Sequence, residues 1–407
     1  MSETVDDFAG DLPVLPSDWA YVTLGGLLEP DGLSYGVVQP GSVDSQGIPV
    51  LRVKNLRNGR VLTDEVTCVS ADIEQKYRRT RLRGGEVLLS VVGSVGETAV
   101  ASSDIAGWNV ARAIGVLRPV SKVSSHWIRL CLTTDLAQRC MRSWRNETVQ
   151  ATLNLRDVRR LPIVMPPEQT REAIAAVLGA LDDKIAANER IAKTCDELRT
   201  LRFARFLDSG RSEANLRPLS SLAEFVNGRA FTKDATGTGR MVIRIAEINS
   251  GPGGSTVYND IEVSDRHLAK PGDVLFSWSG SLTVARWFRA ESIINQHIFK
   301  VVPKEDLPNW LVFEFVKSAL TKFQSIAAGK ATTMGHIQRH HLDELVVAPV
   351  GESVGHLDRD LGPLWYRALA AEKESLALAD LHQLLLPRLM SGVVRVRDAE
   401  KVVEEVL

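Results

Sequence analysis

The chain of 407 residues is longer than one ordinary folding unit, and its length suits two domains with connecting segments. Hydrophobic residues make up 44% and charged residues 24%, as in globular proteins, and no apolar run approaches the ~20 residues that span a bilayer. These features exclude a membrane-spanning protein. Because the formal net charge is −1, any binding to nucleic acid must depend on local basic surfaces or on a partner.

The N-terminal residues Met1–Asp7 are acidic and lack the basic start and apolar run of a signal peptide, so we expect a cytoplasmic protein. The four cysteines, Cys68, Cys131, Cys140 and Cys195, form no Cys-x-x-Cys pair. This spacing predicts reduced and mostly buried thiols, with neither a disulfide framework nor a structural zinc site.

Short β-branched runs bounded by glycine, proline and asparagine dominate residues 12 to about 165. They predict strands over Val50–Val53, Glu86–Val92 and Ile114–Leu117. A helix is predicted over Ser125–Leu132, and its pattern recurs with its tryptophan at Pro308–Phe315. We therefore expect the first 165 or so residues to form a globule of strands and turns with helical inserts.

At Pro166-Pro167 the pattern changes to the alternating four- and three-residue spacing of a coiled-coil seam. Proline is tolerated in the first turn of a helix, so these two residues mark its beginning. We expect one helix that continues to about Phe206. Its seam positions are Ile174, Leu178, Leu181, Ile185, Asn188, Ala192 and Cys195.

The chain contains two diverged copies of one pattern, about 183 residues apart, and each copy is a globule followed by a long helix. Such a protein presents two similar surfaces at a fixed separation. The corresponding segments are Ile48–Val53 with Arg240–Ile245, Arg83–Ser90 with Lys270–Ser277, Gly93-Ser94 with Gly280-Ser281, Ile163–Pro166 with Val346–Pro349, and Leu198–Gly210 with Leu381–Gly392.

The second long helix is expected from about Ser353 to Leu386, and Gly362-Pro363 predicts a kink or a restart at Leu364. Both seams are too apolar to remain exposed and each complements the other, so we predict an intramolecular antiparallel pair. The alternatives are that each helix packs on its own globule or that the helices mediate oligomerisation. The second seam comprises Leu357, Leu361, Leu364, Ala368, Ala371, Ser375, Leu378 and Leu385.

These elements predict an α+β fold in which two similar α/β domains are joined by two long antiparallel coiled-coil-like helices, with a pseudo-twofold internal repeat. The expected parts are a first domain at 1–165, a central helix at 166–209, a second domain at 210–350, a distal helix at 351–392 and a C-terminal tail at 393–407. The candidate interface between the helices, or with a partner, is Ile174, Leu178, Leu181, Ile185, Leu361, Leu364, Leu378 and Leu385.

The sequence lacks the motifs of the common nucleotide, methyl-donor and metal chemistries. Ser325–Ala331 has the lysine of a phosphate-binding loop without its first glycine, and Gly237–Arg240 lacks the third glycine of a dinucleotide-binding turn. There is no Asn-Pro-Pro-aromatic motif of amino-methyltransferases, and the eight histidines lack metal-ligand spacing. We therefore expect a protein that is not an enzyme and has no metal site.

Side chains that contact phosphates and base edges cluster in both copies. Lys76–Arg83 is a basic run with Tyr77 inside it, and the polar loops Glu147–Asn154 and Lys330–His336 hold corresponding places. Charged runs are usually solvated surface, but their recurrence favours nucleic-acid recognition. The candidate DNA-binding residues are Arg52, Lys54, Arg78, Arg79, Arg81, Gln150, Thr152, Asn154, Arg229, Lys233, Arg244, Lys330, Thr332, Thr333, His336 and Arg339.

Across essentially its whole length the chain resembles the specificity subunit of type I restriction-modification systems. The resemblance depends on the two-copy layout, the closing Leu384–Gly392, the Pro166–Gln169 entry into a long helix and the Thr332–Ile337 loop. It implies two target-recognition domains, each reading half of a split double-stranded DNA site, with the helices as spacer and as docking surface for adenine methyltransferase (modification) subunits. It also implies that those partners use S-adenosylmethionine, that this chain binds no cofactor, and that translocase/restriction subunits join the complex.

Two alternatives stay open at this point. One is a coiled-coil scaffold whose globules bind protein, which predicts no base preference. The other is a stand-alone DNA-binding regulator, which predicts tight binding by the isolated chain.

Overall fold

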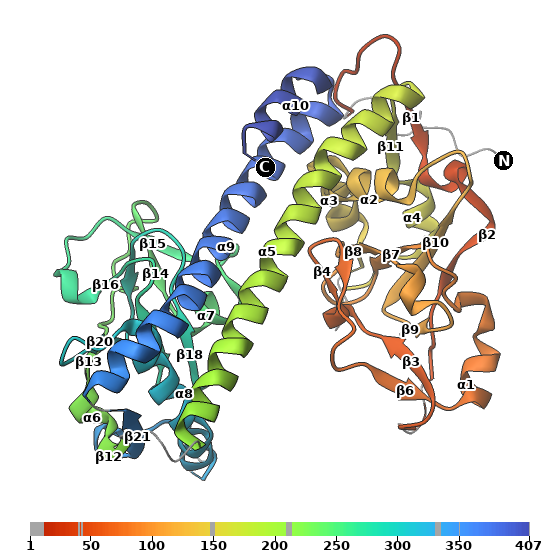
Figure 1. The fold of residues 1–407 in the computed structure, drawn as a ribbon. Helices are drawn as coiled ribbons and strands as arrows, with labels where there is room; N and C mark the ends of the chain where they lie inside the picture. The colour runs from red at the N-terminus through yellow and green to blue at the C-terminus, as the bar shows by residue number, and fades with distance from the viewer. Residues whose placement is uncertain are drawn as a thin grey trace. The chain divides into compact units, whose positions relative to one another are not determined.

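The computed structural model describes residues 12–39, 41, 44–146, 151–208, 214–329, 335–349 and 351–406. The chain divides into two compact units, of which the first comprises residues 1–183 with 379–407 and the second residues 184–378. The division falls inside both long helices, α5 (Glu168–Asp208) and α9 (Glu352–Met390) (Figure 1). Each unit therefore contains part of each helix, and the expected domain boundaries at the helix ends stay a prediction.

The first unit is built on a four-stranded antiparallel sheet, a three-stranded mixed sheet and two two-stranded ribbons. The four-stranded sheet has the order β2 (Leu28–Tyr35), β10 (Ile114–Pro119), β7 (Val87–Ser90), β8 (Thr98–Val100). The mixed sheet has the order β6 (Thr67–Val69), β3 (Ile48–Leu51), β9 (Asn109–Val110), and the ribbons pair β1 (Ala20–Thr23) with β11 (Pro162–Met165) and β4 (Leu56–Arg57) with β5 (Arg60–Val61).

Short helices complete the first unit, and α2 packs against β7, β8, β10 and β11. This cover explains why β7 is buried along its whole length and why its sequence is a continuous apolar run. The predicted strands at residues 50–53, 86–92 and 114–117 are therefore confirmed, within a few residues, as β3, β7 and β10. The helices are α1 (Ala71–Lys76), α2 (Ser125–Thr133), α3 (Asp135–Trp144) and α4 (Leu155–Arg160).

The second unit repeats this topology. Its four-stranded sheet has the order β13 (Ala223–Asn227), β20 (Ile298–Pro303), β17 (Val274–Ser277), β18 (Thr283–Arg286). Its second sheet has the order β15 (Val257–Asn259), β14 (Arg240–Ile243), β19 (Ser292–Ile294), β16 (Leu268–Ala269), and its ribbon pairs β12 (Ala214–Pro218) with β21 (Leu345–Pro349). The helices are α6 (Leu219–Leu222), α7 (Ile245–Ser250) and α8 (Asn309–Ala328), of which α8 covers β17, β18 and β20 as α2 does in the first unit.

Equivalent side chains shape equivalent turns in the two units. The Glu86 carboxylate accepts the Arg83 backbone N–H at 2.8 Å, and the Asp273 carboxylate accepts the Lys270 N–H at 2.7 Å. The hydroxyl of the last residue in each strand donates four residues ahead, from Ser90 to Ser94 O and from Ser277 to Ser281 O. The predicted internal repeat is thus confirmed at the level of single hydrogen bonds.

The helix α5 has 41 residues and α9 has 39, close to the expected lengths. The expectation of a restart at Leu364 is wrong, because α9 continues through Gly362-Pro363. Pro363 is exposed, while Leu361 and Trp365 on either side are buried in the core of the second unit, and this packing outweighs the lost helical hydrogen bond. The predicted tail contains a further helix, α10 (Val396–Glu404).

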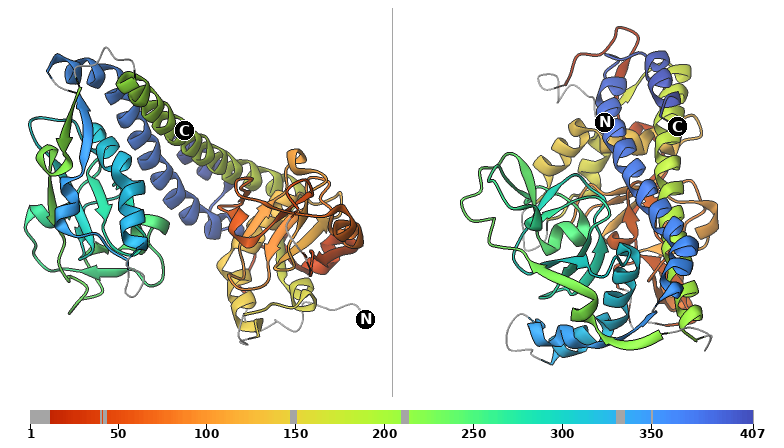
Figure 2. Two further views of the ribbon diagram at one scale, coloured as in Figure 1. Left: turned by 90° about the horizontal axis from the view of Figure 1, so that it is seen from below. Right: turned by 60° about the vertical axis from the view of Figure 1, so that its left-hand side comes forward.

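Within each unit the two helix segments lie side by side (Figures 1 and 2). In the second unit Ala192 packs against Ala368 and Ala371, while Asn188 donates to Glu374 at 2.9 Å. From Asn188 to Ala192 the residue numbers on α5 rise, while those of their contacts on α9 fall from Glu374 to Ala371 and Ala368. The two helices are therefore antiparallel. Of the candidate interface residues, Ile174, Leu178, Leu181, Leu361, Leu378 and Leu385 are buried, and Ile185 and Leu364 are partly buried.

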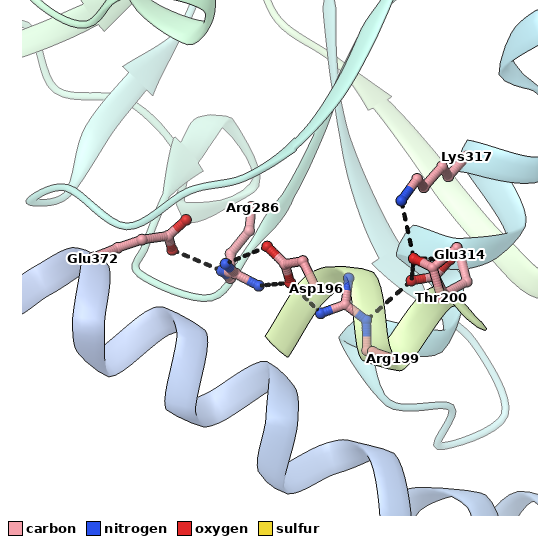
Figure 3. Close-up of polar contacts among 7 residues, drawn as sticks. All are labelled: Asp196, Arg199, Thr200, Arg286, Glu314, Lys317 and Glu372. Carbon is pink, nitrogen blue, oxygen red and sulfur yellow. Dashed lines mark hydrogen bonds and ion pairs between the residues drawn. The ribbon is translucent and has the colours of Figure 1, made fainter. Parts of the chain in front are cut away.

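Buried ion pairs bind the helices to the sheet of the second unit (Figure 3). From β18, Arg286 donates to Glu372 on α9 at 2.8 Å and to both oxygens of Asp196 on α5 at 3.0 and 3.1 Å. Next to it, Arg199 donates to Asp196 at 2.5 Å and to Glu314 on α8 at 3.0 Å. Both guanidinium groups lie over the Trp365 ring, at 4.5 Å for Arg286 and 4.9 Å for Arg199. We call these residues, with Thr200, the ion network.

Among the described residues, no helix combines the length and apolarity that a membrane span requires.

Candidate nucleic-acid interface

The arginines of the basic run Lys76–Arg83 have different environments. Arg81 donates to both oxygens of the buried Glu74, one of them at 2.9 Å, and this hydrogen bonding holds the pKa of Glu74 below its ordinary value although burial opposes it. Arg78 and Arg79 are exposed, and the described structure gives their side chains no partner. Arg78 and Arg79 are therefore free to meet a phosphate, as are Lys76 and Arg83, which are also exposed and have no side-chain partner in the described structure.

An arginine follows equivalent strands in the two units, Arg52 after β3 and Arg244 after β14. The guanidinium of Arg244 donates to both oxygens of Glu247, at 3.0 and 2.6 Å. Burial raises the pKa of Glu247, but its hydrogen bonds, led by those from Arg244, outweigh burial and keep that pKa below its ordinary value. Arg52 is exposed, and Lys54 pairs with Glu65 at 2.9 Å on the surface. Arg244 is thus already engaged within the fold.

The two polar loops reach equivalent positions. Thr152 forms an antiparallel bridge with Val92, and His336 forms one with Ser279. The structure also places Asn154 at the exposed N-terminal cap of α4. The remaining loop candidates, Gln150, Lys330, Thr332 and Thr333, lie outside the described residues.

Two other candidates of the second unit, Arg229 and Arg339, border a cavity of about 520 Å³. Arg229 and Arg339 line it and have no ion-pair partner in the described part of the chain, whereas Arg266 pairs with Glu224. His267 also lines the cavity, and burial, followed by repulsion from Arg229 and Arg266, lowers its pKa. Glu262 lines the cavity as well, so three arginines (Arg229, Arg266 and Arg339) face two carboxylates (Glu224 and Glu262), and the lining is net positive at neutral pH by one charge. Lys233 is exposed nearby in the sequence but does not line it.

An aromatic surface next to this cavity was missed by the sequence reasoning. Its residues are Trp278, His297 and His336, which we call the aromatic ledge; of these, only His336 was a candidate from the sequence, and Trp278 packs on the buried Phe299. The Trp278 ring lies 5.1 Å from His297, 5.9 Å from Phe299 and 6.4 Å from His336, and its Nε1–H donates to Asn227 at 2.9 Å. A partly exposed tryptophan beside polar side chains suits stacking on bases. The sequence signal was Trp278 itself, two residues before the Gly280-Ser281 turn.

No group of three His, Cys, Asp or Glu side chains among the described residues is placed to hold a metal ion. Burial raises the pKa of the Cys131 thiol, which disfavours the reactive thiolate.

The chain is similar to type I specificity proteins. Residues 16–194 match the family model described as the type I restriction modification DNA specificity domain. The specificity subunit of the type I restriction enzyme EcoBI from Escherichia coli is 28% identical over 167 residues, which cover 40% of this chain and 35% of that protein. The match thus spans about a third of the length of that curated relative.

One solved structure shares the fold over almost the whole chain. The S subunit of a type I restriction-modification system from M. genitalium has a TM-score of 0.55 at 12% identity, covering 93% of this chain and 98% of that one. The HsdS subunit from Thermoanaerobacter tengcongensis is 16% identical and covers 95% and 99% of the two chains, with a TM-score of 0.37. Together with the domain match, the first of these confirms the resemblance inferred from the sequence.

Proposed function

We propose, from the premise that residues 16–194 form a type I DNA specificity domain, that this chain is the sequence-reading subunit of a type I restriction-modification complex. Each unit would read one half of a bipartite DNA site. The observation that carries the proposal is the duplication: the same order of strands is built twice, and each copy has exposed arginines. Two similar modules in one chain suit two short half-sites in one duplex.

The helices supply the spacer and the docking surface for modification subunits. Leu201 on α5 is 68% exposed and Leu384 on α9 is 48% exposed, and the two occupy corresponding positions of the repeat. Ala204 and the exposed Arg205 follow Leu201 at the third and fourth positions, and Pro387 and the exposed Arg388 follow Leu384 in the same way. We call these two sets of three residues the outer strips. An exposed leucine at the same place in both copies is explained by two contacts with the same kind of partner.

Under this proposal the chain is non-catalytic and works in the cytoplasm, where its DNA is. The partner modification subunits use S-adenosylmethionine to methylate adenine, and translocase/restriction subunits join through the complex. The near-neutral net charge of −1 supports this division, because partner subunits can supply the cations that hold the phosphates.

The test of the function is to express the chain with its modification subunits in cells without other adenine methylation and to map methylated adenines across the genome. A bipartite sequence with one fixed gap is expected. Methylation at a continuous site, or none above a control with the modification subunits alone, would refute the proposal.

The outer strips can be tested separately by co-purification. Leu201→Asp and Leu384→Asp should each remove one modification subunit from the complex, and the double variant should remove both. Arg190→Asp, an equally exposed change three turns earlier on α5, serves as the control. Normal stoichiometry in the double variant would show that the strips do not dock these subunits.

A further inference from the structure

One turn has the same backbone in both units. The β9–β10 turn (residues 111–113) and the β19–β20 turn (residues 295–297) each begin with a parallel bridge, to Val37 and to Arg229 respectively. In the middle of the turns, the Arg112 N–H donates to Val37 O and the Gln296 N–H donates to Arg229 O, both at 2.8 Å. The two turns are therefore equivalent positions of the repeat.

Glycine fixes how closely the neighbouring chain approaches each turn. A Cβ on Gly36 would lie 2.1 Å from Val110 O, and a Cβ on Gly228 would lie 2.1 Å from Asn295 O. No other residue fits either position without moving the backbone. In both units the chain at the glycine must therefore lie close to the backbone of the strand or turn beside it.

Each turn is also held from its other side. The Val91 N–H donates to Ala113 O at 2.8 Å, and the Trp278 N–H donates to His297 O at 3.0 Å. With both flanks held by backbone hydrogen bonds, the middle residue is the one whose side chain is exposed, Arg112 in the first unit and Gln296 in the second. The fold therefore presents one side chain from a rigid support in each unit.

The surroundings of the turns differ in chemistry although their backbones match. The first unit has Tyr35, Val91, Ala113 and Thr152 where the second has Asn227, Trp278, His297 and His336. Buried positions of the repeat, by contrast, keep their chemistry, as Trp127 and Trp310 do in α2 and α8. Divergence at a surface with a preserved framework is the pattern of two sites that bind different versions of one ligand.

The second turn also carries features typical of a binding site. His297 has φ of 74°, a left-handed conformation that non-glycine residues rarely adopt. Its ring Nδ1 is buried without a hydrogen-bond partner in the described structure. Backbone strain of this kind occurs at binding sites, where contacts with a ligand can compensate for it.

We propose that Arg112 and Gln296 are the specificity-determining residues of the first and second half-sites. This inference rests on the proposed function and adds the residues that read the bases. Arginine pairs best with the O6 and N7 atoms of guanine, and glutamine with the N6 and N7 atoms of adenine. Arg112 therefore reads a G·C pair in one half, and Gln296 reads an A·T pair in the other.

The experiment uses the complex of the full chain with its modification subunits and a duplex containing the mapped methylated site. Methyl transfer is measured on this duplex and on duplexes with every single base-pair substitution, for wild type and for Gln296→Arg, Gln296→Ala and Arg112→Gln. Asn249→Ala, an exposed amide on α7 of the same unit, is the matched control. Because both turn residues are exposed, the substitutions should leave folding intact, and circular dichroism checks this.

Gln296→Ala should lower the preference for A·T at one base pair of the second half-site by roughly five- to 150-fold, the range for one bidentate contact. Gln296→Arg should shift that preference to G·C, Arg112→Gln should produce the opposite change in the first half, and Asn249→Ala should change neither. Unaltered preferences, or an equal loss on all duplexes as expected of a phosphate contact, would overturn the inference while leaving the function standing. If the wild-type complex has no bipartite site, the function itself fails.

Discussion

Replacing Arg199 with methionine should destabilise the second unit by about 3–5 kcal/mol, the range for removing one member of a buried ion pair. The Arg199 side chain is fully buried and that of Glu314 is 3% exposed, so Glu314 would lose its charged partner without gaining water. Only the Thr200 hydroxyl, at 3.0 and 3.2 Å, would still donate to it. Asp196 would keep Arg286, which confines the unpaired charge to Glu314.

The measurement is urea unfolding of the full chain, with amide hydrogen exchange in α8 to identify the transition of the second unit. Arg202→Met is the matched control, since Arg202 is exposed on the same helix, and it should change stability by less than about 0.5 kcal/mol. Adding Glu314→Leu to Arg199→Met removes the stranded carboxylate and should recover most of the loss. The reasoning is refuted if Arg199→Met falls within 1 kcal/mol of wild type, or if the double variant is no more stable than the single one.

Three further outcomes are expected. Leu181→Asp, at a fully buried seam position, should lower the free energy of unfolding by at least ~3 kcal/mol and abolish co-purification of the modification subunit. Ile185→Asp, at a partly buried position, should lower it by less. Equal effects of the two substitutions would contradict this packing. Burial holds the pKa of His382 below 6.5, despite attraction by Asp182, so the native state binds fewer protons than the unfolded state. The stability of the first unit should therefore fall as pH drops below about 6.5, and His382→Gln should reduce that fall in denaturation curves. The purified chain, incubated with DNA and labelled S-adenosylmethionine, should transfer no methyl group.

The sequence allowed the repeat, its main strands and its long helices to be predicted because their signals are periodic. Apolar runs such as Val87–Leu89 are buried on both faces, and seam positions such as Leu178 and Leu378 are completely buried. The continuity of α9 could not be predicted, because proline disfavours a helix locally while the burial of Leu361 and Trp365 depends on tertiary packing. The helix propensity of single residues is a weak guide where tertiary packing opposes it.

The candidate interface was predicted less well than the fold, for a related reason. Charge and residue type identified Arg78, Arg79 and Arg229, which are exposed, but also Arg244, whose guanidinium is engaged by Glu247. The sequence does not show whether an arginine already has a partner. Gln296 was missed because a single polar residue in a turn has no periodic signal, and its equivalence to Arg112 becomes visible only when strands are superimposed.

If the helices set the gap between half-sites as proposed, the division of both helices between the units constrains how that gap can change over generations. Because α5 and α9 each begin in one unit and end in the other, residues inserted into one of these helices alone would leave the other helix too short to match it. A viable new gap requires matched insertions in both segments, in whole turns of about four residues, so that Asn188 still meets a carboxylate such as Glu374. Gap length should therefore evolve in discrete, compensated steps, whereas base preference can drift one residue at a time.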